Sequence, residues 1–185
     1  LSSVDEDIRR IIELRTGSET GSRRQFGKTR QARLVAIQAA IREVQRPVWN
    51  LIRKNLRESA VELGVNEIAF TDGLITAALP VQVSLALPTS NLIRAIAVSK
   101  PFEGRILRRW VSQLETTDST RMMDQIRIGL VQGESNQQIS RRVFGTGAQN
   151  FKDGTRELTK ANIAGITRTA VNFITNESRQ ELYKA

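Results

Sequence analysis

The chain has 185 residues, no cysteine and no histidine, and a formal net charge of +9. The lack of cysteine excludes disulfides and thiolate metal sites, and the lack of histidine removes the commonest general base and metal ligand. No run of eighteen apolar residues and no signal-peptide pattern occurs, so the sequence predicts neither a membrane span nor secretion. A chain of this length suits one sizeable core or an extended helical body.

The positive charge is concentrated between Arg23 and Arg57, where Glu43 is the only acid and the rest of the chain is balanced. Such a segment is typical of contacts with nucleic-acid phosphates or with an acidic protein surface. A solvated helix face without any partner is the plainer alternative. The predicted contact residues are Arg23, Arg24, Lys28, Arg30, Arg33, Arg42, Arg46, Arg53, Lys54 and Arg57.

The first region, residues 1–64, is predicted to contain two helices joined by a linker. Ser3 and Glu6 have the spacing of a capping box ahead of an apolar repeat, which predicts a short amphipathic helix over residues 4–15. Residues 16–29 are rich in glycine and serine and carry several basic residues, which is typical of a flexible basic linker.

A long helix is predicted from Arg30 to Leu63, kinked near Pro47 and stopped by Gly64. Its apolar residues step by three and four and form a narrow seam, which packs either within this chain or against a partner helix. The seam consists of Leu34, Ile37, Ile41, Val44, Val48 and Leu51.

The second region, residues 65–100, is predicted to be irregular or extended. Apolar and polar residues alternate over 81–87 between two prolines, which indicates one short β-strand. Residues 91–99, capped by Thr89 or Ser90, are predicted to form a short helix.

The third region, residues 101–185, is predicted to be a helical unit that opens with a helix from Pro101, in which Trp110 belongs to the core. A helix over 119–131 ends at Gly133, and Ser135 with Gln138 forms a capping box that starts a shorter helix. A polar loop over 145–154 leads to a last helix over 159–183. The predicted fold class is therefore mainly α, an extended multi-helix assembly with a C-terminal helix–turn–helix–loop–helix unit.

Two stretches, Ile128–Val143 (IGLVQGESNQQISRRV) and Ile163–Phe173 (IAGITRTAVNF), resemble the tailed-phage minor head protein family, also described as Mu F-like or head-morphogenesis proteins. The likeness covers about residues 102–183. Val171 departs from the pattern, because the family usually has a polar residue there, and no chemistry is assigned to it. The residues that match the motif are Gly129, Gly133, Ser135, Ile139, Arg168, Thr169 and Asn172.

The resemblance implies a non-enzymatic structural component of a virion, without cofactor or metal. By this likeness the chain is expected at the portal vertex inside the phage head, in several copies, after assembly in the host cytoplasm. The expected partners are the portal protein or the major capsid protein, together with packaged double-stranded DNA bound without sequence preference. The expected role is in head morphogenesis, DNA packaging and retention, or ejection.

Two alternatives remain open from the residues alone. A helix–turn–helix DNA-binding regulator would read bases with Asn136, Gln137 and Gln138 at the start of the helix that follows Ser135. A magnesium-dependent nuclease would use carboxylates only, and the acids show no spacing that defines a metal site.

Overall fold

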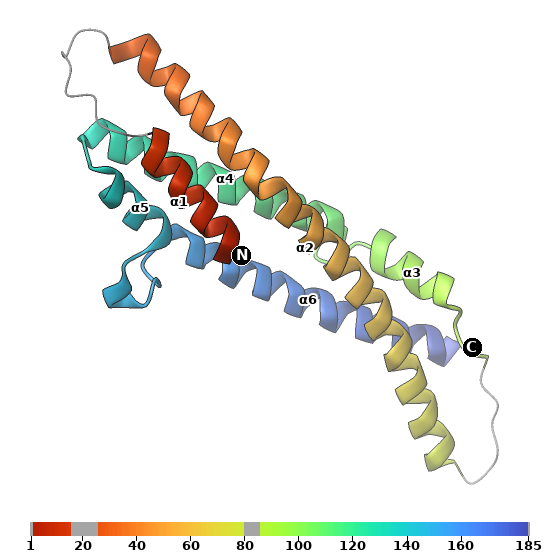
Figure 1. The fold of residues 1–185 in the computed structure, drawn as a ribbon. Helices are drawn as coiled ribbons and strands as arrows, with labels where there is room; N and C mark the ends of the chain where they lie inside the picture. Colours follow the sequence, from red (N-terminus) through yellow and green to blue (C-terminus); the bar gives the residue numbers. More distant parts are fainter. Residues whose placement is uncertain (1, 16–25, 80–85, 185) are drawn as a thin grey trace. The chain divides into compact units, whose positions relative to one another are not determined.

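The computed structural model describes residues 2–15, 26–79 and 86–184, and the side chains within these ranges except those of residues 2, 15, 26–30 and 33. The described residues are mainly α-helical, which confirms the predicted fold class (Figure 1). The elements are α1 (Ser2–Arg15), α2 (Phe26–Ala78), α3 (Ser90–Ser99), α4 (Leu107–Gln132), α5 (Asn136–Phe144), a 3-10 turn (Gly147–Gln149) and α6 (Thr155–Lys184). Most of the predicted strand falls in residues 80–85, outside the described ranges, and residues 86 and 87 are not in a strand.

Residues 1–50 and 113–162 form one compact unit, and residues 51–112 and 163–185 form a second. We call them the first and second units. The helices α2, α4 and α6 each contribute residues to both units.

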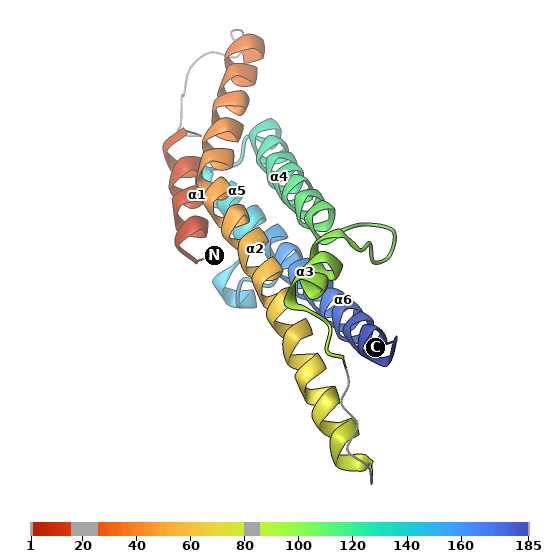
Figure 2. The same ribbon diagram turned by 90° about the vertical axis from the view of Figure 1, so that its right-hand side faces the viewer.

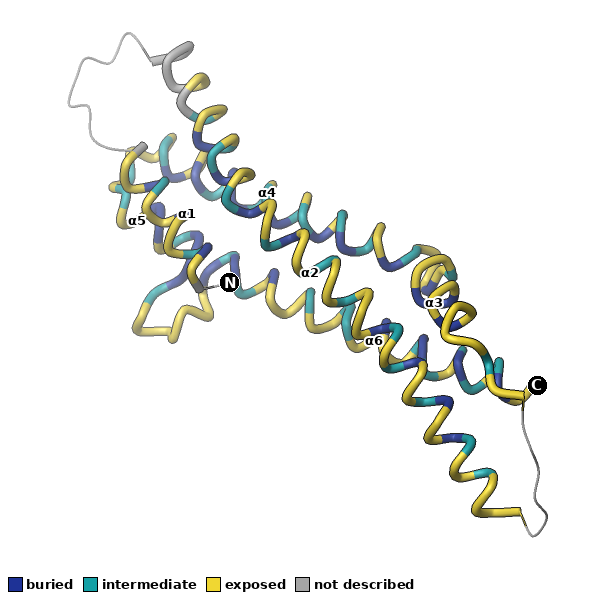
Figure 3. The backbone as a smooth tube through the Cα atoms, turned by 45° about the vertical axis from the view of Figure 1, so that its right-hand side comes forward, coloured by how far each residue is buried: buried dark blue, intermediate teal, exposed yellow. Residues whose placement is uncertain are grey.

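The first unit has a core built from α1, α2, α4 and α5, in which α1 packs against α5. Buried positions recur every three or four residues along these helices, as Figure 3 shows. The predicted seam residues Ile37 and Ile41 are fully buried in this core, with Leu34, Val44 and Val48 packed against it. The part of the seam in this unit therefore packs within the chain.

The second unit has two apolar clusters. One joins α2, α4 and α6 through Ala60, Leu107 and Ile174, and the other joins α2, α3 and α6 through Ile68, Ile93 and Leu182. Figure 2 shows α3 beside the second half of α2. The predicted cap of α3 is confirmed, because the Thr89 side chain accepts a hydrogen bond from the backbone of Leu92.

Several predicted boundaries are wrong. Residues 26–29 of the predicted linker and residues 65–78 of the predicted irregular region are helical, because both belong to α2, and α6 begins at Thr155. At Gly64 and Pro101 the reason is that tertiary packing overrides a local signal. Gly64 does not stop α2, which continues to Ala78. A Cβ atom at Gly64 would lie 2.5 Å from Ile93 Cγ2 and 2.9 Å from Ser178 Oγ, so this glycine lets α3 and α6 approach α2 closely. Pro47 also lies inside α2 without ending it, and the kink at this proline stays a prediction.

The helix predicted from Pro101 instead begins at Leu107 and runs without a break to Gln132. Before it, Phe102 and Arg105 pair their backbones in a tight turn, at 3.0 and 3.1 Å, with positive φ at Gly104. Phe102 is held by Trp110, whose Nε1 donates to the Phe102 carbonyl at 3.3 Å. Trp110 packs against the apolar cluster of the second unit, so its predicted place in the core is confirmed.

Two glycines of α2 are expected to respond in opposite directions to alanine. The Gly64→Ala variant should lose about 1–2 kcal/mol of unfolding free energy, because the cost of overpacking exceeds the gain in helix propensity. A Cβ atom at Gly73 would have no atom within 4 Å, so Gly73→Ala should gain up to about 1 kcal/mol. Equilibrium urea unfolding of both variants checks this, and an equal gain in both would contradict the close packing at Gly64.

Candidate nucleic-acid interface

The predicted contact residues fall into two groups by what the structure describes. Arg23 and Arg24 lie outside the described residues. Lys28, Arg30 and Arg33 lie in α2, but their side chains are not among those described. The described basic side chains of the segment are therefore those within residues 42–57.

Within residues 42–57 the basic side chains are mostly at the surface of α2. In the first unit, Arg42 and Arg46 are exposed. In the second unit, Lys54 and Arg57 are exposed, whereas Arg53 is half-buried and has an interaction within the chain. Four exposed basic side chains on one helix are available for contacts with phosphates or acidic side chains.

Arg42 and Arg46 differ in their local partners. Arg46 Nη2 lies 3.1 Å from Glu43 Oε2, in a pair whose side chains are 66% and 67% exposed. An exposed ion pair of this kind contributes only about 0–1 kcal/mol, so an incoming anion can compete for the guanidinium. Arg42 forms no ion pair with any residue that the structure describes.

Both arginines line a groove of about 360 Å³ between α2 and α4 in the first unit. From α2 the groove is lined by Gln38, Arg42, Glu43, Gln45 and Arg46. From α4 it is lined by Glu115, Thr116, Ser119 and Thr120. The lining therefore combines guanidinium, amide and hydroxyl groups, which are hydrogen-bond donors to an anion, with two carboxylates.

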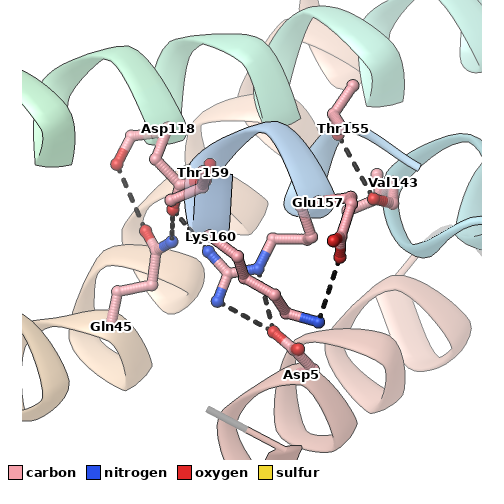
Figure 4. Close-up of polar contacts among 10 residues, drawn as sticks. Asp5, Gln45, Asp118, Val143, Thr155, Glu157, Thr159 and Lys160 are labelled. Atoms are coloured by element: carbon pink, nitrogen blue, oxygen red, sulfur yellow. Dashed lines mark hydrogen bonds and ion pairs between the residues drawn. The ribbon is translucent and has the colours of Figure 1, made fainter. Parts of the chain in front are cut away.

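Two of the lining residues, Gln45 and Ser119, belong to a hydrogen-bond network, and Figure 4 shows its buried part around Gln45, Asp118 and Thr159. Gln45, which is 2% exposed, donates from Nε2 to Asp118 Oδ2 at 2.8 Å and accepts from Ser119 Oγ at 3.2 Å. Asp118 also accepts from Thr159 Oγ1 and from Arg156 Nη1, each at 2.5 Å.

Arg156 connects this network to α1. Its Nε and Nη2 atoms each lie 2.8 Å from Asp5 Oδ1, and its side chain is only 5% exposed. One buried guanidinium thus contacts two carboxylates, from α1 and α4. We call Asp5, Gln45, Asp118, Arg156 and Thr159 the buried polar network, and it joins α1, α2, α4 and α6 within the first unit.

Burial raises the pKa of the Asp118 carboxyl above its ordinary value. The guanidinium of Arg156 and the hydrogen bonds from Thr159 and Gln45 oppose this effect by stabilising the carboxylate. A buried carboxylate of this kind is stabilised by its partners and not by water. Removal of Asp118 or of Arg156 is therefore expected to lower the free energy of unfolding.

The motif residues around the end of α4 form a tight turn between α4 and α5. A Cβ atom at Gly129 would lie 2.5 Å from Ile139 Cγ1, so glycine lets the fully buried Ile139 pack against α4. Gly133 has φ of +72°, the left-handed conformation that ends α4 as predicted. The predicted capping box is confirmed, with the Gln138 amide 3.3 Å from Ser135 Oγ and the Ser135 amide 2.8 Å from Gln138 Oε1.

The other motif residues, Arg168, Thr169 and Asn172, lie in the part of α6 that belongs to the second unit. Arg168 and Asn172 are exposed. Thr169 Oγ1 donates to the Gly165 carbonyl at 3.2 Å, one turn earlier in the helix. A docking role for these residues stays a prediction.

The start of α5, the candidate base-reading helix, is engaged within the first unit. Asn136 Nδ2 donates to the Glu13 carbonyl of α1 at 2.9 Å, and Gln138 is held by the capping box. At the other end of α5, Arg142 pairs with Glu134 and also contacts Gln132. These contacts give α5 a packing role and leave few of its polar side chains for base edges.

Sequence analysis missed the buried polar network and the hydroxyl side of the groove. The sequence contains one signal for the network. Asp118 lies four residues after Leu114 and four before Met122, in the apolar stripe of α4. A charged residue in such a stripe indicates a buried partner. No local pattern identifies Arg156 or Asp5 as that partner, since they lie far away in the sequence.

Among the residues that the structure describes, no group of three or more acids is placed to hold a metal ion. Over the same residues, no helix combines the length and the apolar character that crossing a bilayer requires. Comparisons with protein-family models, with curated proteins and with solved structures found no match to this chain.

Proposed function

We propose that this chain is a non-enzymatic structural component of a phage particle, similar to the minor head proteins. In this proposal it lies near the portal inside the head, against the portal or capsid protein, and assists head morphogenesis, packaging, retention or ejection of DNA. Its basic segment contacts DNA phosphates, or an acidic protein surface, without reading sequence.

The observation that carries the DNA contact is the placement of charge. The net charge of +9 is contributed by the segment from Arg23 to Arg57, and Arg42, Arg46, Lys54 and Arg57 are exposed on α2. Contacts of basic side chains with phosphates depend on charge and spacing but not on the base sequence.

The structural part of the proposal is supported by the role of the motif residues. Gly129, Gly133, Ser135 and Ile139 all serve the packing and capping of the turn between α4 and α5. These roles within the fold are compatible with a structural component, and the proposed place in the phage head comes from the resemblance to the minor head family.

The DNA contact is tested by measuring binding to two unrelated duplexes over a salt series. We expect similar affinities for both duplexes and a steep fall of log K with log salt concentration. Replacing Arg42, Arg46, Lys54 and Arg57 with glutamine should reduce the magnitude of the slope by about 3 to 4, because each lost phosphate contact contributes about 0.9.

A control variant loses the same charge elsewhere, through glutamine at the exposed positions Arg94, Arg108, Arg109 and Lys152. The control should keep the wild-type slope. A flat salt dependence in the wild type, or an equal loss in both variants, would contradict the DNA contact. Mass spectrometry of purified particles from cells that carry this gene tests the particle itself, where we expect the chain to sediment with the heads.

A further inference from the structure

We propose that the groove between α2 and α4 binds a single phosphodiester group of a nucleic-acid backbone, through Arg42 and Arg46 on one side and the Thr120 hydroxyl on the other. The inference rests on the proposed DNA contact and makes it more specific. One phosphate group is assigned to this groove, while the other exposed basic side chains of α2 contribute only surface charge.

Three features of the groove favour an anion. Arg42 has no ion-pair partner among the described residues, and the pair of Arg46 with Glu43 is exposed and weak. Guanidinium groups match the geometry of phosphate oxygens and bind them in a bidentate manner. Thr120 is exposed and lines the opposite wall, where a hydroxyl donates a hydrogen bond without adding charge.

Part of the groove lining is held in place by hydrogen bonds. Gln45 and Ser119 line the groove and are hydrogen-bonded to each other, and Gln45 is held by the buried Asp118. These two lining side chains are therefore already fixed in position and lose little entropy when a ligand binds beside them. Lys54 and Arg57 do not line this groove.

The carboxylates of the lining set the preferred charge of the ligand. The lining contains two arginines and two glutamates, Glu43 and Glu115, so the four charges cancel formally. A phosphodiester carries one negative charge, whereas free phosphate approaches two near neutral pH. A formally neutral lining gives the second charge no net attraction, while its desolvation still costs free energy, so the phosphodiester is favoured. The groove, of about 360 Å³, has room for such a group.

The test uses the full chain and a matched pair of uncharged substitutions. Thr120→Val removes the hydroxyl at nearly constant shape, and Thr76→Val does the same at an exposed position of α2 outside the groove. Affinity for a short duplex at fixed salt should fall about two- to tenfold in Thr120→Val, with an unchanged salt slope, and should stay at the wild-type value in Thr76→Val.

Two substitutions that each remove one positive charge provide the second comparison. Arg42→Gln and Lys54→Gln should each reduce the magnitude of the salt slope by about 1. Arg42→Gln should lower the affinity more, because it also removes the bidentate contact. Equal affinities in these two variants, together with equal affinities in the two valine variants, would overturn the inference while leaving the proposed DNA contact in place.

A titration with dimethyl phosphate separates the two proposals further. In the wild-type chain the Arg42 side-chain NMR resonance should shift with dimethyl phosphate, and should shift less with inorganic phosphate at the same concentration. If duplex DNA does not bind but dimethyl phosphate still shifts this resonance, the site stands and the proposed DNA contact fails. If dimethyl phosphate gives no shift, or inorganic phosphate gives the larger one, the phosphodiester site is wrong.

Discussion

Replacing Arg156 with methionine is expected to lower the free energy of unfolding by about 3–5 kcal/mol. The substitution keeps the length and much of the apolar stem of the side chain but removes the guanidinium between Asp5 and Asp118. Asp118, which is 2% exposed, then remains as a buried carboxylate without a cation. The loss is large because a buried charge that has lost its partner is stabilised neither by water nor by a counter-charge.

Lys160→Met is the control for this effect. Lys160 lies one turn further along α6 and pairs with Glu157 at 3.5 Å, but the two side chains are 47% and 41% exposed, so water reaches this pair. Its replacement should change the unfolding free energy by less than about 1 kcal/mol. Chemical denaturation measures both variants, and adding Asp118→Asn to Arg156→Met should recover part of the loss. Similar values for Arg156→Met and Lys160→Met would show that the buried polar network does not stabilise the first unit.

Some features of this fold are determined by residues close together in the sequence, whereas the buried polar network depends on residues that are far apart. The caps of α3 and α5 are determined by neighbouring residues, since Thr89 and Ser135 each bond to an amide three positions on. Both are predictable from the sequence for that reason. Arg156 and Asp118 meet only after the helices pack, and the alternation of apolar residues contains no information on which charged pair will meet.

The same distinction explains the wrong boundaries. Gly64 and Pro101 are strong local signals for a helix end and a helix start. At Gly64 the gain from packing α3 and α6 against α2 exceeds the cost of a glycine within a helix, which is about 1 kcal/mol. After Pro101 the chain first forms the Phe102–Arg105 turn, which places Phe102 against Trp110 and Phe173, at ring-centroid distances of 6.0 and 5.6 Å.

Of the candidate interface, only the part formed by α2 was predictable from the sequence. The basic residues of α2 are evident from charge counting, whereas the hydroxyl wall of the groove belongs to α4, about seventy residues later. Helix pairing brings the two together, and a run of Thr and Ser in a helical segment predicts no ligand by itself. This is why the sequence indicates a basic surface and the structure indicates a groove.

The loop between α5 and α6 depends on Gly145, and Gly145→Ala is expected to lower the free energy of unfolding by about 3 kcal/mol. Gly145 has φ of +84° and ψ of −178°, a conformation that is essentially confined to glycine. A Cβ atom there would also lie 2.5 Å from Asp153 Oδ1 and 2.8 Å from the Gly154 amide nitrogen. Asp153 closes the loop by accepting hydrogen bonds from the Thr146 amide at 2.7 Å and the Thr146 hydroxyl at 2.9 Å.

Gly147→Ala in the same loop is the matched control, since no atom lies within 4 Å of its Cβ position and its φ is not positive. This variant should stay within about 0.5 kcal/mol of the wild type. Urea unfolding measures the stabilities, and limited proteolysis reports whether the loop has opened, with faster cleavage between residues 145 and 154 expected in Gly145→Ala alone. The hydrogen bond from the Thr146 amide lowers the pKa of Asp153, so opening of the loop should return that pKa toward its ordinary value. If both alanine variants unfold at the same urea concentration and are cleaved at the same rate, the loop is not held by the Gly145 conformation, and its closure rests on Asp153 alone.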